Sequence, residues 1–272
     1  MAIAGTESFP DYDNPPLTEV VCGILFQNLE SFLTPHVGLL WEKFKLDYPY
    51  CQEVAPLAPA IEQFGESLDV EFDLIDIPPL PRVWFLNENG SEIIQIQRDR
   101  FLHNWKKVSS QDIYPKYSTV IKKFKQHIFD FELFLKEIDL EPILPLQYEL
   151  TYVNHIPQGD GWRSVEDVGK IFPNFSWHFN SNQLLELEGI NWRTTLTLPA
   201  KSGRLYASIR NGIRQQDNQP VFLFELTARG IGHYNSRDAM WEWFDLAHKF
   251  LVQSFAELTD KEVQENAWRH KK

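Results

Sequence analysis

Residues 14–26 have the sequence Asn14-Pro15-Pro16-Leu17-Thr18-Glu19-Val20-Val21-Cys22-Gly23-Ile24-Leu25-Phe26. Two prolines stiffen the start of this run, and the apolar, β-branched residues that follow are typical of a buried strand. A helix start comes soon afterwards, because Thr34 suits the N-cap and Pro35 the first helical position. The run therefore predicts a fold that opens with a strand and continues with a helix.

Alternating and helical apolar patterns predict a similar order of elements in both parts of the chain. Further strands are predicted over residues 82–86, 92–105, 146–156, 189–198, 204–211 and 221–228. Long helices are predicted over 115–138 and from the cap Ser236 onward. Antiparallel strands with separate long helices indicate the α+β class: antiparallel sheets, long packed helices and two similar β-α-β-β-α halves. We expect a flexible tail over 1–13, an N-terminal half over 14–145 and a C-terminal half over 146–272, packed as one compact unit.

The charge of the chain is strongly acidic, at −12, and seven acidic residues with no basic one lie between Glu53 and Asp76. This balance argues against direct binding of nucleic acid, which requires a basic surface. The segment 53–81, which is also rich in proline, is a candidate docking surface, although acidic runs are more often ordinary surface charge. A short strand over 68–75 would interrupt this long connection.

The two cysteines and the N-terminus bear on the expected compartment. Cys22 and Cys51 do not form a disulfide framework, and no metal-binding motif or cofactor-binding loop is present. The first 13 residues lack an apolar signal region, and no run is long enough to span a membrane. We therefore expect a cytoplasmic protein without a metal, a cofactor or a membrane association.

Two stretches resemble a sporadically distributed family of uncharacterised bacterial proteins. They are residues 15–26 and Gly90-Ser91-Glu92-Ile93-Ile94-Gln95-Ile96-Gln97-Arg98-Asp99-Arg100-Phe101-Leu102-His103-Asn104-Trp105. Weaker similarity lies in Tyr152-Val153-Asn154-His155-Ile156 and in the closing Trp268. The resemblance covers nearly the whole chain. It implies a bacterial cytoplasmic protein of patchy occurrence, which suits an accessory or defence-type gene cassette, and it implies no particular reaction.

The densest polar cluster on a predicted strand is in the second arm of the hairpin that turns at residues 87–90. Its members are Gln97, Arg98, Asp99, Arg100, His103 and Asn104. Strand alternation predicts that Arg98 and Arg100 share a face, where they could hold a carboxylate or phosphate. They could equally pair with neighbouring acids and fix the hairpin register.

The strands of the second half carry a further set of polar side chains. Arg210 shares a predicted face with Tyr206 and Ser208, and Arg229 shares one with Glu225 and Thr227. These arginines could hold an anionic ligand or peptide, or could simply be solvated. His155 with Asp160 could act as an acid and base, although such a pair is more often structural.

Three functions fit these patterns. The first is a non-enzymatic protein-interaction module that binds a protein partner or itself through the 53–81 segment and the Gln97–Asn104 cluster. The second is a module that holds an anionic or apolar small molecule between the sheet and the long helices, whose aromatic stripes could instead be plain core. The third is an enzyme of unknown class that uses Arg98, Asp99, Arg100 or His155. No residue has a catalytic motif around it.

Overall fold

The computed structural model describes residues 10–58, 61–62, 81–175, 187–231 and 236–271. Its strands are β1 (Leu17–Phe26), β2 (Tyr50–Val54), β3 (Arg82–Leu86), β4 (Glu92–Gln97), β5 (Arg100–Lys106), β6 (Pro145–Pro157), β7 (Asn191–Thr197), β8 (Gly203–Arg214) and β9 (Gln219–Ile231). The helices are α1 (Thr34–Phe44), α2 (Tyr117–Glu137), α3 (Val168–Ile171), α4 (Arg237–Leu258) and α5 (Lys261–Asn266), with short 3₁₀ turns at Val165–Asp167 and Pro199–Lys201.

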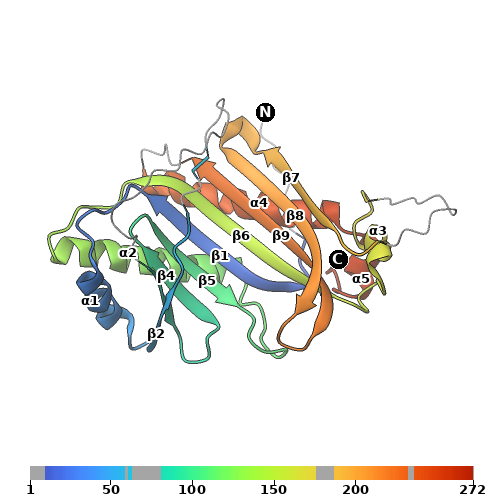
Figure 1. The fold of residues 1–272 in the computed structure, drawn as a ribbon. Helices are drawn as coiled ribbons and strands as arrows, with labels where there is room; N and C mark the ends of the chain where they lie inside the picture. The colour runs from blue at the N-terminus through green and yellow to red at the C-terminus, as the bar shows by residue number, and fades with distance from the viewer. Residues whose placement is uncertain (1–9, 59–60, 63–80, 176–186, 232–235, 272) are drawn as a thin grey trace.

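All nine strands form one antiparallel sheet in the order β2-β3-β4-β5-β1-β6-β9-β8-β7 (Figure 1). The α+β class with an antiparallel sheet and long helices is therefore confirmed. The opening stretch is at the centre of this sheet, because β1 pairs with β5 on one side and with β6 on the other.

The two halves of the sheet repeat one topology. In the first half the order is β1-β5-β4-β3, and in the second it is β6-β9-β8-β7. The long helix α2 follows β5 in the chain, and α4 follows β9 in the same way. β1 and β6 meet in the middle, and β2 is an extra strand at the edge of the first half. The predicted likeness of the halves thus appears as an arrangement of elements within a single sheet.

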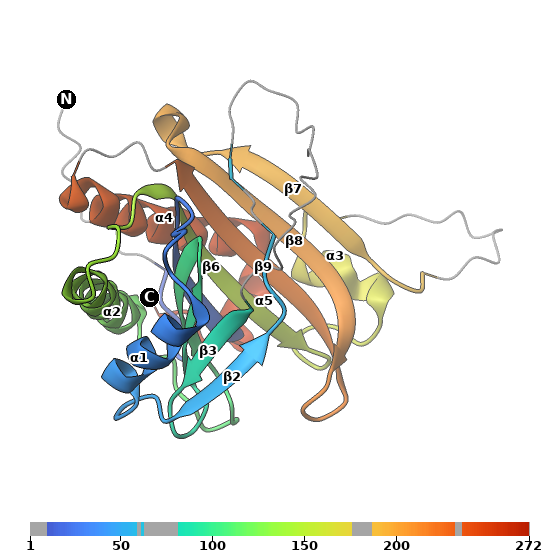
Figure 2. The same ribbon diagram turned by 60° about the vertical axis from the view of Figure 1, so that its left-hand side comes forward.

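Helices α2 and α4 cover one face of the sheet, which we call the helix side, and α1 packs beside α2 (Figures 1 and 2). Strand β1 turns Val20, Cys22 and Ile24 to the helix side, where each is fully buried. Aromatic rings fill the layer between, with Phe101 stacked on Phe131 at 5.1 Å between ring centroids. Two further phenylalanines of α2 differ in exposure, because Phe134 is buried and Phe129 is 53% exposed.

One predicted helix cap is confirmed, whereas the start of α1 and one edge strand differ from the prediction. Ser236 caps α4 as predicted, because its hydroxyl accepts a hydrogen bond from the Ala239 amide at 3.2 Å. The N-cap of α1 is Leu33 rather than Thr34, a one-residue shift of the kind common at helix ends. The mostly exposed β2 was not predicted. The predicted strand over 68–75 lies outside the described residues.

Residues 10–13 are fixed to the other end of the chain. Tyr12 is buried, and its hydroxyl donates to Gln264 Oε1 at 2.9 Å. The Asn14 amide donates to the Trp268 carbonyl at 3.1 Å, and the Lys271 amide to that of Asp11 at 2.8 Å. The described part of this segment is therefore hydrogen-bonded to the C-terminal segment.

Candidate functional site

The face opposite the helices, which we call the open face, is lined mainly by polar side chains. A hydrogen-bonded row crosses it from β3 to β1: Trp84 Nε1 donates to Gln95 at 3.0 Å, Gln95 to Asn104 at 2.7 Å, and Asn104 to Glu19 at 2.6 Å. Gln95 and Asn104 are buried, so their partners must come from within the protein. Asn104 is thus a member of a polar row that ends at Glu19.

Part of the acidic segment lies on this face next to the Gln97–Asn104 cluster. The side-chain amide of Gln97 accepts from the Leu57 amide and donates to the Leu57 carbonyl, both at 3.0 Å. Arg100 donates to the Ala58 carbonyl at 3.1 Å and pairs with Asp99 at 2.8 Å. The two surfaces predicted to bind a partner are therefore in contact with each other. The side chains of Gln97 and Arg100 form hydrogen bonds to main-chain groups of the acidic segment.

Glu62 is the described residue of this segment that reaches furthest across the sheet. Its amide donates to Gln147 Oε1 at 2.8 Å, and its carboxylate binds Arg204 and the Tyr206 hydroxyl. Arg229 lies 3.8 Å from the same carboxylate and forms a closer pair with Glu149 at 2.7 Å. Arg229 therefore pairs with acidic groups of its own chain. The predicted polar face of β8 and β9 is confirmed, because Tyr206 pairs with Thr227 across the two strands.

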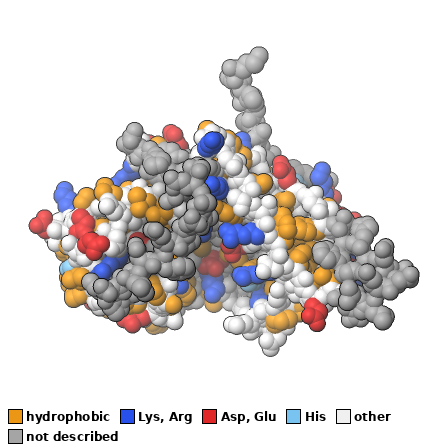
Figure 3. All heavy atoms as spheres, turned by 45° about the horizontal axis from the view of Figure 1, so that its top comes forward, with side chains coloured by type: hydrophobic (Ala, Val, Ile, Leu, Met, Phe, Trp, Pro, Cys, Tyr) orange, Lys and Arg blue, Asp and Glu red, His pale blue; other side chains and the backbone are white. Residues whose placement is uncertain are grey.

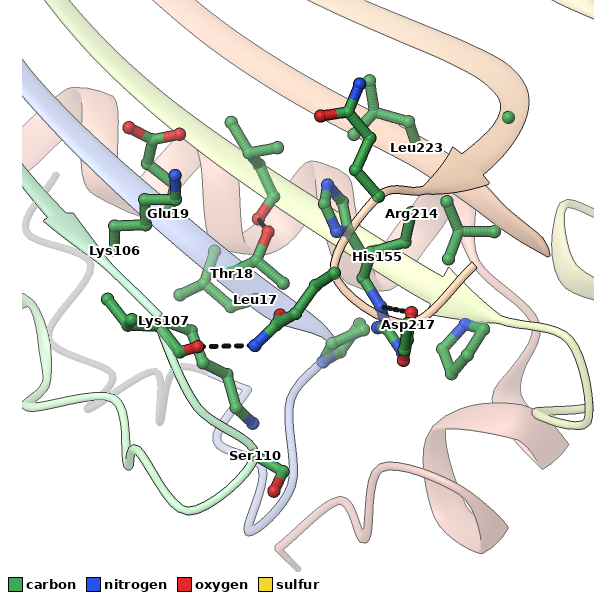
Figure 4. Close-up of a pocket in the computed structure, with 18 of the residues that line it drawn as sticks. Leu17, Thr18, Glu19, Lys106, Lys107, Ser110, His155, Arg214, Asp217 and Leu223 are labelled. Atoms are coloured by element: carbon green, nitrogen blue, oxygen red, sulfur yellow. Dashed lines mark hydrogen bonds and ion pairs between the residues drawn. The ribbon is translucent and has the colours of Figure 1, made fainter. Parts of the chain in front are cut away.

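A cleft of about 1230 Å³ occupies the end of the open face beyond Glu19. Its floor is formed by the start of β1 and the end of β6, and its walls by the β8–β9 hairpin and the segment after β5 (Figure 4). The Gln216 side chain donates to the Val108 carbonyl at 2.6 Å and joins the two walls. In the space-filling view, Lys and Arg side chains gather along the hollow of the molecule (Figure 3).

The cations of the cleft outnumber its acids. Lys106, Lys107 and Arg210 line it, and none of them is paired with an acidic side chain within the described ranges. A fourth cation, Arg214, pairs with Asp217 at 2.5 Å. Because the whole chain carries −12, these unpaired cations make the cleft a local exception to its charge.

His155 and Asp160 both line this cleft. Burial lowers the pKa of His155, and the neighbouring Arg214 and Lys106 lower it further. Burial raises the pKa of Asp160, whereas Arg214 opposes that shift. His155 Nδ1 is buried without a hydrogen-bond partner in the described structure. At neutral pH His155 is therefore an uncharged side chain in the lining of the cleft.

The predicted long arm over 92–105 is wrong as a single strand. Arg98 and Asp99 form a two-residue turn between β4 and β5, so Gln97 pairs directly with Arg100 across the hairpin. Arg98 lies apart from Arg100 and donates to the Phe32 carbonyl at 3.0 Å. The turn also reverses the alternation, because residues that pair across a hairpin share a face.

His103 is consequently on the helix side, away from Gln97 and Asn104. It is 1% exposed and lies against His127 of α2, at 4.8 Å between ring centroids. Burial lowers the pKa of each imidazole to about 3. His103 is thus part of the core.

The residues of the enzyme hypothesis do not converge on one point. Arg100, Leu25 and Gln147 lie in one row across β5, β1 and β6. His155 is eight positions further along β6 than Gln147, which is roughly 27 Å in a strand. A reacting group could not contact Arg100 and His155 together.

No group of three or more His, Cys, Asp or Glu side chains in the described ranges could hold a metal ion. A search of the same residues for a helix with the length and apolarity to cross a membrane found none. Comparison of the chain with protein-family models, with curated proteins and with solved structures gave no match. The resemblance to the sporadically distributed bacterial family therefore stays a prediction.

Sequence analysis did not single out Lys107, Arg214 or Glu62. For Lys107 a weak signal was present, because Lys106 and Lys107 directly follow the predicted strand over 92–105. Arg214 belongs to the cleft only because the β8–β9 hairpin curves towards the segment after β5, which no local pattern indicates.

Proposed function

We propose that the protein is a non-enzymatic interaction module that binds an acidic segment of a protein partner in the cleft of its open face. The observation that carries this proposal is a group of three cations, Lys106, Lys107 and Arg210, that have no ion pair with a described residue and line a cleft of about 1230 Å³. Unpaired cations in a concave site attract acidic partners and accelerate their association.

The size of the cleft favours a polypeptide over a small molecule. Small-molecule sites typically occupy about 300–1,000 Å³, and this cleft is larger and open along one side. Its strand floor and two loop walls suit an extended chain, which would replace the Gln216–Val108 hydrogen bond between the walls (Figure 4).

The neighbouring part of the open face supports the same chemistry. There Gln97 and Arg100 bind main-chain groups of Leu57 and Ala58, and Arg204 and Tyr206 bind the carboxylate of Glu62. Contacts of this kind suit acidic, extended segments, because Gln97 and Arg100 bind the main chain whatever its sequence and Arg204 and Tyr206 bind a carboxylate.

The cellular setting is part of this proposal. The motifs at 15–26 and 90–105 support a bacterial cytoplasmic protein of an accessory or defence-type cassette. A reducing compartment also suits two cysteines that are both free, Cys22 being buried and Cys51 exposed.

The test uses a fluorescein-labelled decapeptide of alternating Asp and Glu, with the Asn and Gln peptide as its uncharged counterpart. We expect saturable binding of the acidic peptide by fluorescence anisotropy, weakening as salt rises. The double variant Lys107→Glu and Arg210→Glu should bind at least about tenfold more weakly, since two attractive charges become repulsive.

The matched control is Lys122→Glu with Lys136→Glu, two exposed lysines of α2 that change the net charge equally. Its affinity should stay within about twofold of the unmodified protein. Equal losses in both double variants would show a general charge effect and would overturn the cleft as the site. Tighter binding of a single-stranded DNA decamer than of the acidic peptide would overturn the class of partner.

A further inference from the structure

A second cavity, of about 420 Å³, lies on the helix side of the sheet. Helices α2 and α4 lie side by side there and are joined by aromatic contacts, such as that of Phe124 with Phe244 at 5.5 Å (Figures 1 and 2). The last contact of this series stacks Tyr117 on His248, with 4.0 Å between ring centroids and 9° between planes.

The cavity exists because α2 begins at Tyr117 whereas α4 continues to Leu258. Beyond His248, Val252 and Phe255 of α4 face the segment at residues 10–15 instead of a helix. Tyr12 of that segment packs edge-on against Phe255 at 5.6 Å. Extended chain does not fill the space that another helical turn would fill, so a cavity of drug-like size remains.

Three polar side chains meet at its inner end. The Tyr114 and Tyr152 hydroxyls lie 3.3 Å apart, and the Tyr152 hydroxyl lies 2.8 Å from His248 Nδ1. These groups can donate and accept hydrogen bonds in an otherwise apolar and aromatic site.

The interior of this cavity is uncharged at neutral pH. Burial lowers the pKa of His248 to about 4, although Asp245 opposes that shift. Burial raises the pKa values of Tyr114 and Tyr152 above the usual range. Among the described residues that line it, the charged ones are Lys116 and Asp11 at the rim, which pair with each other at 2.5 Å.

We infer that this cavity, which we call the phenol pocket, binds a small, flat, uncharged aromatic molecule carrying one hydrogen-bonding group. The stacked Tyr117 and His248 rings offer a flat wall, and Val252 and Phe255 offer apolar contacts. The hydroxyls of Tyr114 and Tyr152 would bind the polar group of the ligand. A charged ligand would lose its hydration without finding an opposite charge inside.

The probe for this inference is 2-naphthol, and its charged counterpart is 2-naphthoate, which has the same two rings. We expect one saturable site for 2-naphthol by calorimetry and by ligand-observed NMR. Binding of 2-naphthoate should be at least about tenfold weaker, because burial penalises its charge.

Two variants locate the site. Val252→Trp fills the cavity and should abolish 2-naphthol binding, whereas Leu133→Trp adds the same side chain at an exposed position of α2 and should not. Tyr152→Phe removes one hydroxyl and should weaken binding by about threefold to tenfold. If Val252→Trp does not fold by circular dichroism, Tyr152→Phe decides alone.

Absence of saturable binding up to millimolar 2-naphthol would overturn the inference. So would equal affinity for 2-naphthoate, or binding that neither pocket variant weakens. A gain in affinity on deleting residues 1–9 would identify those residues as a competing occupant and would leave the ligand class supported. Because Lys107→Glu with Arg210→Glu should leave 2-naphthol binding intact, this test is independent of the proposed partner site.

Discussion

The two cavities lie on opposite faces of one sheet, and they differ in the charge of the side chains that line them. In the cleft on the open face, Lys106, Lys107 and Arg210 have no ion pair with a described residue, whereas the phenol pocket holds its titratable interior groups uncharged. The start of β1 separates them, because Pro15 and Leu17 line both. A strand with alternating side chains can thus serve two unrelated surfaces, one electrostatic and one apolar. The difference predicts that substitutions in the aromatic core of the helix side cost the most stability, and that substitutions of the cleft cations mainly affect binding of an acidic partner.

The largest effect is expected in the aromatic core of the helix side. Phe131→Ala removes a ring that stacks on Phe101 and contacts Phe26 and Phe32, and should lower the free energy of unfolding by about 3–5 kcal/mol. Phe129→Ala, on the same helix but 53% exposed, should change it by less than about 0.5 kcal/mol. Urea unfolding followed by circular dichroism measures both. Similar losses would contradict the assignment of Phe131 to the buried face of α2 and of Phe129 to its exposed face.

The buried histidine pair should make stability fall in acid. His103 and His127 have pKa values lowered from 6.5 to about 3, so the unfolded chain binds protons that the folded protein cannot. Above about pH 7 both histidines are neutral in the folded and the unfolded state, so they do not lower the free energy of unfolding. As the pH falls through 6.5 towards 3, only the unfolded chain takes up these protons, and the free energy of unfolding decreases. The loss at pH 5 should be about 2 kcal/mol for each histidine.

The variant His103→Phe tests this contribution. Its loss of stability between pH 7 and pH 5 should be smaller by about 2 kcal/mol than that of the unmodified protein. Ile128→Val, a change in the same core that involves no titratable group, is the control and should keep the original pH dependence. Urea unfolding at both pH values measures these changes. If His103→Phe loses as much stability between pH 7 and pH 5 as the unmodified protein does, the proposed contribution of His103 is refuted.

A smaller effect is expected where the open face holds its own acidic segment. Glu62→Gln removes the charge that Arg204 and Arg229 face and should cost about 1–2 kcal/mol, because both arginines are partly solvated. Glu225→Gln changes a half-buried carboxylate of the same face that has no ion pair with a described residue, and should cost less. Thermal unfolding of the two variants side by side provides the measurement. Equal effects would mean that the Glu62 contacts contribute little.

These comparisons also indicate what local sequence can predict. The faces of β8 and β9 were predictable because side chains alternate strictly within an unbroken strand. The same rule gave a wrong result for Arg98 and His103, since the Arg98-Asp99 turn contains none of the glycine or asparagine residues that usually mark a tight hairpin. The cleft and the phenol pocket were beyond prediction because each combines side chains from distant elements. Tyr114, Tyr152 and His248 approach one another only after the sheet and both long helices have formed.

The smallest effect on stability, and the sharpest test of the comparison, is Lys107→Glu. Lys107 is half-buried in the wall of the cleft and has no ion pair with a described residue, so the free energy of unfolding should change by less than about 1 kcal/mol. Affinity for the acidic decapeptide should fall severalfold, because an unpaired cation becomes an anion. Affinity for 2-naphthol should stay the same, since Lys107 does not line the phenol pocket. Anisotropy and calorimetry on one preparation give both affinities. A change of more than about twofold for 2-naphthol would show that the two cavities are coupled, and the shared residues Pro15 and Leu17 would be the first candidates to transmit that coupling.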